Sequence, residues 1–188
     1  MAFLRIVLAC VLLACVYGIV HDQVTARLCI EYFTLAHPPL GLGESPTVLG
    51  LAWGVLATWW VGLGLGLALA TAARAGSWPK LTVRDLGWTL FGFVVVLFAL
   101  AMMALMAGWA AGVSDRFKPP ELIAAELSYE RWKHFTAAAW AHAASYFFGA
   151  FGGIALCVHL VLLRWRRARG HASDATGSAA GAAPRAGA

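Results

Sequence analysis

Long apolar stretches alternate with short polar connections along this chain. A bilayer core of about 30 Å is crossed by roughly 20 helical residues, and four stretches reach that length: residues 3–20, 48–73, 88–113 and 140–163. None of them alternates apolar and polar positions as the strands of a membrane barrel do, and backbone groups in lipid must bond within their own segment. The pattern predicts an all-α fold, a bundle of four transmembrane helices.

The distribution of helix breakers predicts that the first and fourth helices continue beyond the membrane. Residues 2–36 contain no proline and only one glycine, Gly18, and residues 121–148 contain neither residue type. Pro119-Pro120 stands directly before the second run, where proline favours a helix start. We therefore expect helical extensions of both spans, side by side at the outer face of the membrane.

When residues are counted outward from the membrane boundary along each extension, polar side chains of the two helices lie at the same distance from the membrane. His21 and Asp22 are level with His142, and Glu31 is level with Glu130. Residues four apart share a helix face, and a polar stripe flanked by apolar residues tends to face a neighbouring element. We predict an outer polar cap composed of His21, Asp22, Gln23, Arg27, Glu31, Glu126, Glu130, His134 and His142. His37, directly before Pro38-Pro39, either folds back onto this cap or is an exposed turn residue.

Three interpretations of the cap compete. In the first it is an ion-pair cluster in which Arg27 bonds to Glu130 or Glu126, since charged groups at a membrane boundary usually pair. In the second it is a metal site, because histidine and carboxylate together suit divalent transition metals; the candidate ligands are His21, Glu31, Glu130, His134 and His142. A haem between the level histidines is a variant of this interpretation. In the third, the cap handles protons or small solutes.

The placement of Lys and Arg predicts the orientation of the bundle. Four arginines directly follow the fourth span, at positions 164, 166, 167 and 169, and the connection at residues 74–87 carries three more cations. The positive-inside rule assigns both regions to the cytoplasm, so both termini are expected inside. The expected location is the cytoplasmic (inner) membrane of a bacterium, with the cap outside.

Composition agrees with a membrane protein and excludes a nucleic-acid partner. Hydrophobic residues make up 61% of the chain and charged residues 12%, whereas soluble domains have about 45–50% and about 25%. The net charge of +5 owes much to the arginine cluster, and no nucleic-acid-binding motif accompanies it.

Small residues predict close packing between the helices. Gly50 and Gly54 are four residues apart, and three further pairs share this spacing, Gly62/Gly66, Gly108/Gly112 and Gly149/Gly153. Such spacing lets helix backbones approach closely in lipid. Trp59 and Trp60 sit near the middle of the second span, where they either fill space or form a wall for a lipid, a quinone or a haem.

The two ends of the chain carry separate expectations. Residues 1–169 form the bundle, and residues 170–188, mostly Ala, Gly and Ser, are expected to be a disordered cytoplasmic tail. An alternative for the N-terminus is lipoprotein processing at Cys15, which follows Leu12-Leu13-Ala14.

The segment with His21-Asp22-Gln23, Thr25 and Arg27, followed by Glu31-Tyr32-Phe33-Thr34 and His37-Pro38, resembles one found in uncharacterised bacterial multi-pass membrane proteins. The resemblance covers the first outer connection and implies no activity. We expect a non-enzymatic membrane protein whose cap binds a partner, a lipid head group or an ion. Its expected partners are the lipid bilayer and either a second copy of the chain or another membrane protein. The alternatives are a small transporter or channel component and a metal- or haem-dependent membrane enzyme.

Overall fold

The structure, a computed structural model, describes residues 1–114 and 116–181, with side chains as far as Gly170. The described residues form helices and turns and no strand. Four helical segments are long and apolar enough to cross a membrane: Ala2–Leu28, Pro46–Arg74, Val83–Val113 and Tyr129–Gly170. The prediction of an all-α fold with four such segments is confirmed.

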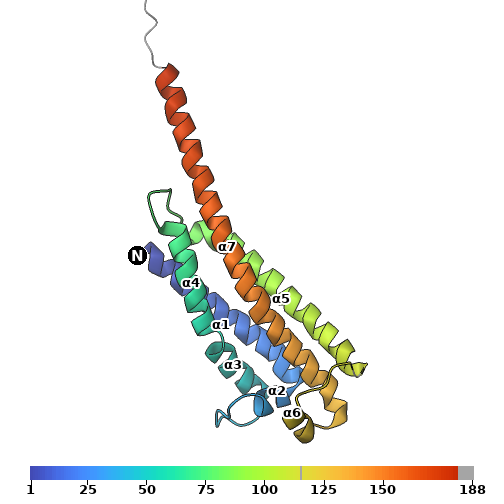
Figure 1. The fold of residues 1–188 in the computed structure, drawn as a ribbon. Coiled ribbons are helices and arrows are strands. Elements are labelled where there is room, and N and C mark those ends of the chain that lie inside the picture. The colour runs from blue at the N-terminus through green and yellow to red at the C-terminus, as the bar shows by residue number, and fades with distance from the viewer. Residues whose placement is uncertain (115, 182–188) are drawn as a thin grey trace, which may run out of the picture.

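The described elements form an elongated up-and-down bundle (Figure 1). In chain order they are α1 (Ala2–Leu28), α2 (Ile30–Leu35), α3 (Pro46–Leu56), α4 (Trp59–Arg74), α5 (Val83–Val113), α6 (Glu121–Glu126), the short 3₁₀ helix η1 (Tyr129–Arg131) and α7 (Trp132–Gly181). The N-terminus and the α4–α5 connection lie at one end of the bundle, and α2 and α6 lie at the other. α1 packs against α3 and α4, and α5 packs along α7.

Glycines allow the close helix contacts that the sequence predicts. A Cβ added at Gly62 would lie 2.7 Å from the Cβ of Ala14, and one added at Gly54 would lie 2.6 Å from the Cα of Ile19. On the other side of the bundle, Gly108 and Gly112 approach α7 in the same way. α1 therefore packs directly against the backbone of both α3 and α4.

The second span is interrupted near its middle. α3 ends at Leu56 and α4 begins at Trp59, and the hydroxyl of Thr58 donates a hydrogen bond to the carbonyl oxygen of Gly54. Trp60 follows the interruption and is 54% exposed on the side of the bundle. The sequence signals no such break, because no proline stands there.

A buried arginine closes the end of the bundle that carries the N-terminus. Arg164 of α7 is 2% exposed beside a core of apolar residues that includes Ile6, Leu69, Leu81 and Leu160. Its guanidinium donates hydrogen bonds to backbone carbonyls at the end of α4 and in the following connection, those of Ala72, Ala75, Trp78 and Pro79. These carbonyls would otherwise lack partners, so Arg164 fixes the α4–α5 connection to α7.

The extension of the first helix is shorter than predicted. α1 ends at Leu28, Cys29 adopts an extended conformation with φ −149° and ψ 92°, and α2 begins at Ile30. The break redirects α2, so that Phe33 is buried with Ala26 and Leu49. The absence of proline and glycine permits a continuous helix here, but burial of α2 overrides it.

The extension of the fourth helix is also interrupted. Residues 121–131 form α6, a bend and η1, and the continuous helix begins only at Trp132. Leu127 is extended and buried against Cys29 and Phe135, and the indole of Trp132 donates to its carbonyl oxygen. This arrangement buries Leu127 against Phe135 of α7, with Ile123 packed beside it, whereas Leu122 of α6 is exposed.

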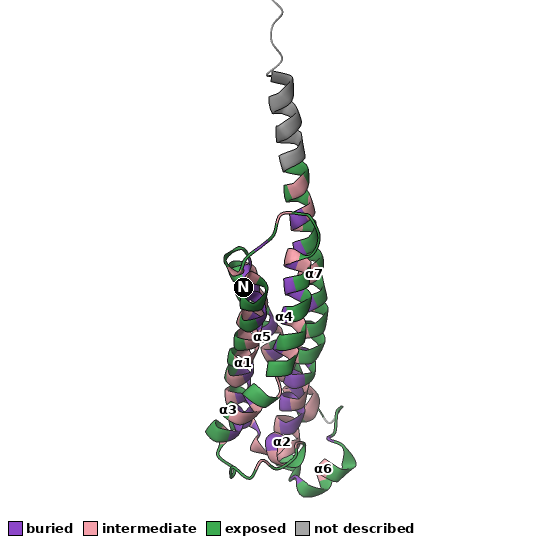
Figure 2. Ribbon diagram, turned by 90° about the vertical axis from the view of Figure 1, so that its left-hand side faces the viewer, coloured by how far each residue is buried: buried purple, intermediate pink, exposed green. Residues whose placement is uncertain are grey.

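Figure 2 shows exposed residues along the outer faces of the long helices. Many are large and apolar, such as Leu12, Phe91, Met103 and Ile154, each more than half exposed. A lipid-facing surface has this character.

α7 is helical to Gly181, past the start of the tail for which we expect disorder. Residues 182–188 of that tail lie outside the described residues.

Candidate functional site

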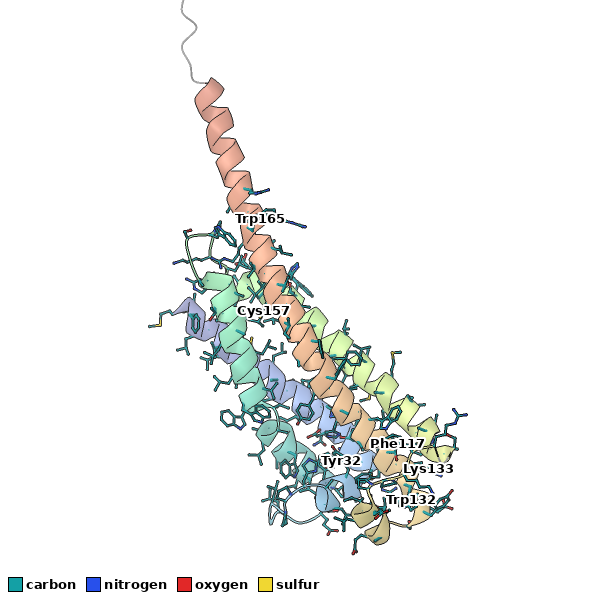
Figure 3. All side chains as sticks on the ribbon, in the orientation of Figure 1. Tyr32, Phe117, Trp132, Lys133, Cys157 and Trp165 are labelled. Carbon is teal, nitrogen blue, oxygen red and sulfur yellow. The ribbon has the colours of Figure 1, made fainter. Side chains whose placement is uncertain are left out.

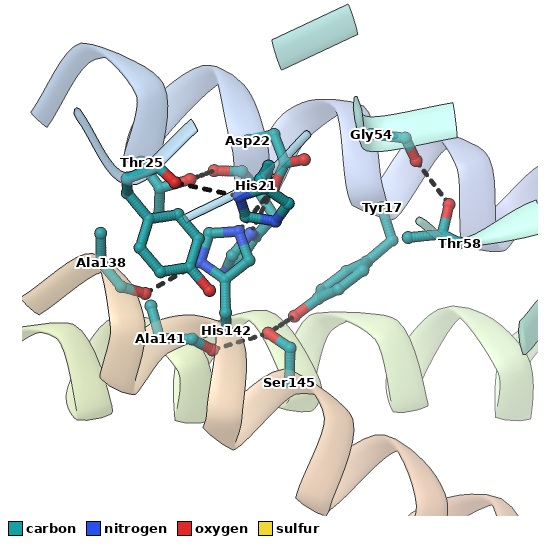
Figure 4. Close-up of polar contacts among 12 residues, drawn as sticks. Tyr17, His21, Asp22, Thr25, Gly54, Thr58, Ala138, Ala141, His142 and Ser145 are labelled. Atoms are coloured by element: carbon teal, nitrogen blue, oxygen red, sulfur yellow. Dashed lines mark hydrogen bonds and ion pairs between the residues drawn. The ribbon is translucent and has the colours of Figure 1, made fainter. Parts of the chain in front are cut away.

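His21, Asp22 and His142 converge in the interior of the bundle (Figure 4). His21 and Asp22 lie on α1, and His142 lies on α7. Oδ1 of Asp22 is 2.9 Å from Nδ1 of His21 and 3.2 Å from Nε2 of His142. The three residues are 2%, 5% and 9% exposed. The sequence places His21 and Asp22 level with His142, and in the structure these three residues are in contact.

The hydrogen bonds of the cluster fix the tautomer of each neutral imidazole. Nδ1 of His142 lies 2.8 Å from the carbonyl oxygen of Ala138, which only accepts, so Nδ1 carries the hydrogen and Nε2 carries a lone pair. Nδ1 of His21 donates to the Asp22 carboxylate, and Nε2 of His21 is buried without a hydrogen bond. With both rings neutral, the lone pair of His142 faces a carboxylate oxygen at hydrogen-bonding distance.

The charge of Asp22 is balanced either by a protonated histidine or by a bound cation. Among the described residues, its ion-pair contacts are with the two histidines, and no Lys or Arg side chain reaches it. A carboxylate buried among apolar helices is costly unless it is paired. A cation bound between the carboxylate and the lone pair of His142 would satisfy both groups.

Aromatic rings enclose the cluster. Tyr32 lies over His142 with ring centroids 4.4 Å apart, and Tyr17 stacks on His21 at 5.8 Å. Ser145 uses its hydrogen to bond the carbonyl oxygen of Ala141, so the Tyr17 hydroxyl donates to Ser145, at 2.7 Å. These ring contacts hold the two histidines in place.

A cavity of about 650 Å³ adjoins the cluster and runs along the bundle. Tyr32 marks its end near α2, and Cys157 lies toward the opposite end (Figure 3). Around the cluster its wall is aromatic, with side chains of Tyr17, Tyr32, Phe33, His37 and Trp53. Farther along, the wall is mostly aliphatic, with Leu65, Leu90, Leu97, Ile154 and Val158, and it includes the rings of Trp60 and Phe93. Small-molecule sites commonly have volumes of about 300–1,000 Å³.

Gln23 and Arg27 are not part of this cluster. Their side chains point to the start of α3, where Arg27 donates to the hydroxyl of Thr47 at 2.9 Å and Gln23 donates to the Thr47 carbonyl at 3.0 Å. The predicted pairing of Arg27 with Glu126 or Glu130 is therefore wrong, because the bends at Cys29 and Leu127 carry those glutamates away.

Glu31 instead pairs with Arg131. Both guanidinium contacts are short, 2.8 Å from Nε to Oε1 and 2.6 Å from a terminal nitrogen to Oε2. These hydrogen bonds lower the pKa of the Glu31 carboxyl to about 2. The thiol of Cys29 donates to the same carboxylate, and burial raises the pKa of this thiol to about 12.

The remaining cap residues are dispersed. Glu126 and Glu130 are exposed, and the Glu130 carboxylate lies 3.9 Å from the ammonium of Lys133. His134 packs on the indole of Trp109, with ring centroids 4.5 Å apart. His37 does fold back: its Nδ1 donates to the carbonyl oxygen of Tyr32, and its ring lines the cavity beside Trp53.

Of the five metal-ligand candidates, the structure brings together only His21 and His142. Glu31, Glu130 and His134 lie in other environments, and Asp22 completes the cluster instead; ligand atoms of His21, Asp22 and His142 all lie within 4.8 Å of one another. The two imidazoles are in edge-to-face contact, with centroids 4.6 Å apart. This contact leaves no space for a porphyrin between them, so in this arrangement they cannot be the two axial ligands of one haem.

The predicted cap omits two polar residues that contact or adjoin the cluster, Tyr17 and Ser145. Tyr17 lies one turn before His21, and Ser145 lies about one turn after His142, so helical spacing alone is sufficient to associate them with the cluster. The cavity has no comparable signal, because its shape depends on how α4 and α5 pack against the other spans.

Comparisons with protein-family models, curated proteins and solved structures find no match to the chain.

Proposed function

We propose that this chain is a multi-pass protein of the bacterial cytoplasmic membrane that binds a divalent transition-metal ion through His21, Asp22 and His142. One observation carries the proposal: two buried imidazoles and a buried carboxylate converge, with Nε2 of His142 3.2 Å from Oδ1 of Asp22 and no hydrogen bond at Nε2 of either histidine. The proposed metal site lies on the outer side of the membrane, as the sequence predicts for the polar cap.

The spacing of the donor atoms suits a metal. Ligands that lie about 2.0–2.2 Å from an ion are about 3 Å from each other when they are neighbours in an octahedral site. The contact between Asp22 and His142, at 3.2 Å, matches that separation, and ligand atoms of all three residues lie within 4.8 Å of one another. Rotation of the carboxylate toward an ion would leave His142 as a nitrogen ligand through Nε2, with one ring nitrogen of His21 beside it.

The tautomer of His142 further supports a metal. Histidines that bind metals commonly donate their second ring hydrogen to a backbone carbonyl or a carboxylate, which orients the ring. His142 donates to the Ala138 carbonyl in this way. A single proton placed between His142 and Asp22 would also relieve their contact, and the retention of metal distinguishes the two cases.

The donor set indicates which metals to test. Two imidazoles and one carboxylate suit zinc, iron(II), manganese(II) or cobalt(II), whereas copper(I) and iron–sulfur clusters prefer thiolates. Three protein ligands leave at least one coordination position open, and the cluster lines the cavity. The open position is therefore available to a small molecule that enters the cavity.

Elemental analysis tests the proposal. We expect the purified protein, loaded with zinc or cobalt(II) and freed of excess metal, to retain one ion per chain. His142→Ala should abolish retention, and His159→Ala, an exposed histidine of the same helix, should not affect it. Cobalt(II) absorption in the visible range gives a second readout from the same samples. No retained metal, or equal retention by His142→Ala and His159→Ala, would refute the metal site.

The orientation has its own test. The arginines that follow the fourth span and the cations of the α4–α5 connection lie at the end of the bundle where the N-terminus lies, and the positive-inside rule assigns that end to the cytoplasm. A reporter fused after Ala188 should be cytoplasmic, and one inserted at Gly43 should be external. The reverse pattern would place the metal site on the cytoplasmic side.

A further inference from the structure

We propose that the cavity binds a neutral molecule with a ring-shaped, oxygen-bearing head and one long apolar chain, the chemistry of an isoprenoid quinone. The head would lie among the aromatic rings beside His21 and His142, and the chain would extend along the aliphatic wall. The position of the head rests on the proposed metal centre, whereas the site of the chain rests on the cavity alone.

The division of the cavity into two parts supports this class of ligand. The part near the cluster is lined by stacked and tilted rings, including His37 and Trp53, whose centroids are 4.7 Å apart. Flat aromatic walls favour a planar head group through ring contacts. The aliphatic part, with Leu65, Leu97 and Val158, offers contacts suited to a hydrocarbon chain.

The lining also argues against a phospholipid. It contains one carboxylate, that of Asp22, and no Lys or Arg. The phosphate of a phospholipid would be buried next to this carboxylate without a basic side chain to pair with, which is unfavourable. A neutral carbonyl-bearing ring brings no negative charge to the cluster and avoids that cost.

The cavity reaches the lipid-facing surface between α4 and α7. Trp60 on α4 and Ile154 and Val158 on α7 line it, and each is more than half exposed on the bundle surface. A chain dissolved in the bilayer therefore has a lateral route into the aliphatic part. The head can follow the same route to the cluster without crossing water.

Two glycines provide a matched pair of variants. A Cβ added at Gly64, which lines the cavity, would meet no atom within 4 Å, so Gly64→Leu should fill the cavity without displacing a neighbouring helix. A Cβ at Gly92 of α5 also meets no atom within 4 Å, and Gly92 is not part of the lining. Gly92→Leu is therefore the control, and neither substitution touches the metal ligands.

Native mass spectrometry of the detergent-solubilised chain tests the inference, with a short-chain ubiquinone and a dioleoyl phosphatidylethanolamine as separate probes. We expect a saturable one-to-one adduct with the quinone, about tenfold weaker binding by Gly64→Leu, and unchanged binding by Gly92→Leu. The absence of a quinone adduct, equal binding by the two variants, or displacement of the quinone by the phospholipid would overturn the inference.

Metal content measured on the same samples separates the two proposals. A quinone adduct in a protein that retains no metal refutes the metal centre and supports the cavity as the binding site of the apolar chain of the quinone. Retained metal without a quinone adduct refutes the quinone site and supports the metal centre. If both proposals hold, Gly64→Leu retains its metal while it loses the quinone.

Discussion

Glu31 and Arg131, 100 positions apart in the chain, join the two bent outer segments by a pair of short hydrogen bonds. The guanidinium also donates to the carbonyl oxygen of Leu28, the last residue of α1. The pair therefore fixes the bend at Cys29 to η1, at the end of the bundle nearest the cluster. This position makes the pair the main electrostatic contact between these segments among the described residues.

The pair should make stability depend on pH in the acid range. The pKa of Glu31 falls from 4.5 to about 2 on folding, so the pair stabilises the fold above pH 4.5 and this contribution is lost as the pH falls toward about 2. Because both side chains are partly exposed, we expect Arg131→Ala to cost about 1 kcal/mol at neutral pH.

Thermal unfolding in detergent at a series of pH values checks this expectation. The variant Glu31→Gln lacks the titrating carboxyl. It should therefore lose less stability than the wild type as the pH falls from about 5 to about 3. Lys118→Ala, at an exposed position, serves as the control. Parallel pH profiles for the wild type and Glu31→Gln would contradict the assigned role of the pair.

Arg164 should be among the least replaceable residues of the fold. Its fork of donors satisfies four backbone carbonyls while being 2% exposed. Arg164→Ala leaves these carbonyls without their partner, at a cost of about 3 kcal/mol, and Arg164→Lys should restore only part of it because an ammonium lacks the planar fork. Arg166→Ala, exposed on the same helix, should leave the melting temperature unchanged. A similar loss in both alanine variants would show that the buried contacts contribute little.

Gly54 should not tolerate a side chain. A Cβ there would lie 2.6 Å from the Cα of Ile19, so Gly54→Ala forces α3 away from α1. We expect a loss of about 2 kcal/mol, whereas Gly92→Ala, in open surroundings, should be neutral or slightly stabilising. Denaturation of the two variants side by side makes the comparison, and a neutral Gly54→Ala would argue against close packing of these helices.

Metal bound at the cluster should be released by acid. Protons compete with the metal for the imidazole nitrogens and for the carboxylate of Asp22, so affinity must fall as the pH is lowered. Replacing the carboxylate in Asp22→Asn removes the negative charge that attracts the ion, and weaker retention is expected at every pH. Zinc retention measured against pH for the wild type and Asp22→Asn tests both points. Retention that does not change with pH would point to binding elsewhere on the chain.

The sequence predicts well whatever depends on regular helix geometry. The matching heights of His21 and His142 follow from the fixed rise per residue, and the structure brings these residues into contact. The same counting places Glu31 level with Glu130, one residue from its actual partner, Arg131. Beyond Leu28 the counting fails, because burial of Phe33 and Leu127 bends the chain at positions that no proline or glycine marks.

The site itself is only partly readable from the sequence. Asp22 is predicted as a cap residue, yet its adjacency to His21 gives no indication that one carboxylate oxygen contacts both histidines. That contact depends on the angle at which α7 crosses α1. The cavity depends in the same way on the packing of four helices, which is a property of three-dimensional arrangement rather than of any local pattern.

The interruption of the second span has a mechanical consequence. α3 and α4 each contact α1 through a glycine of their own, Gly54 and Gly62. Ala57 and Thr58 separate the two helices, and the N–H of Thr58 bonds the carbonyl oxygen of Val55 instead of continuing the regular ladder. Both Ala57 and Thr58 line the cavity. The joint therefore lets the span change direction within the cavity wall, so that each half keeps its own close contact with α1.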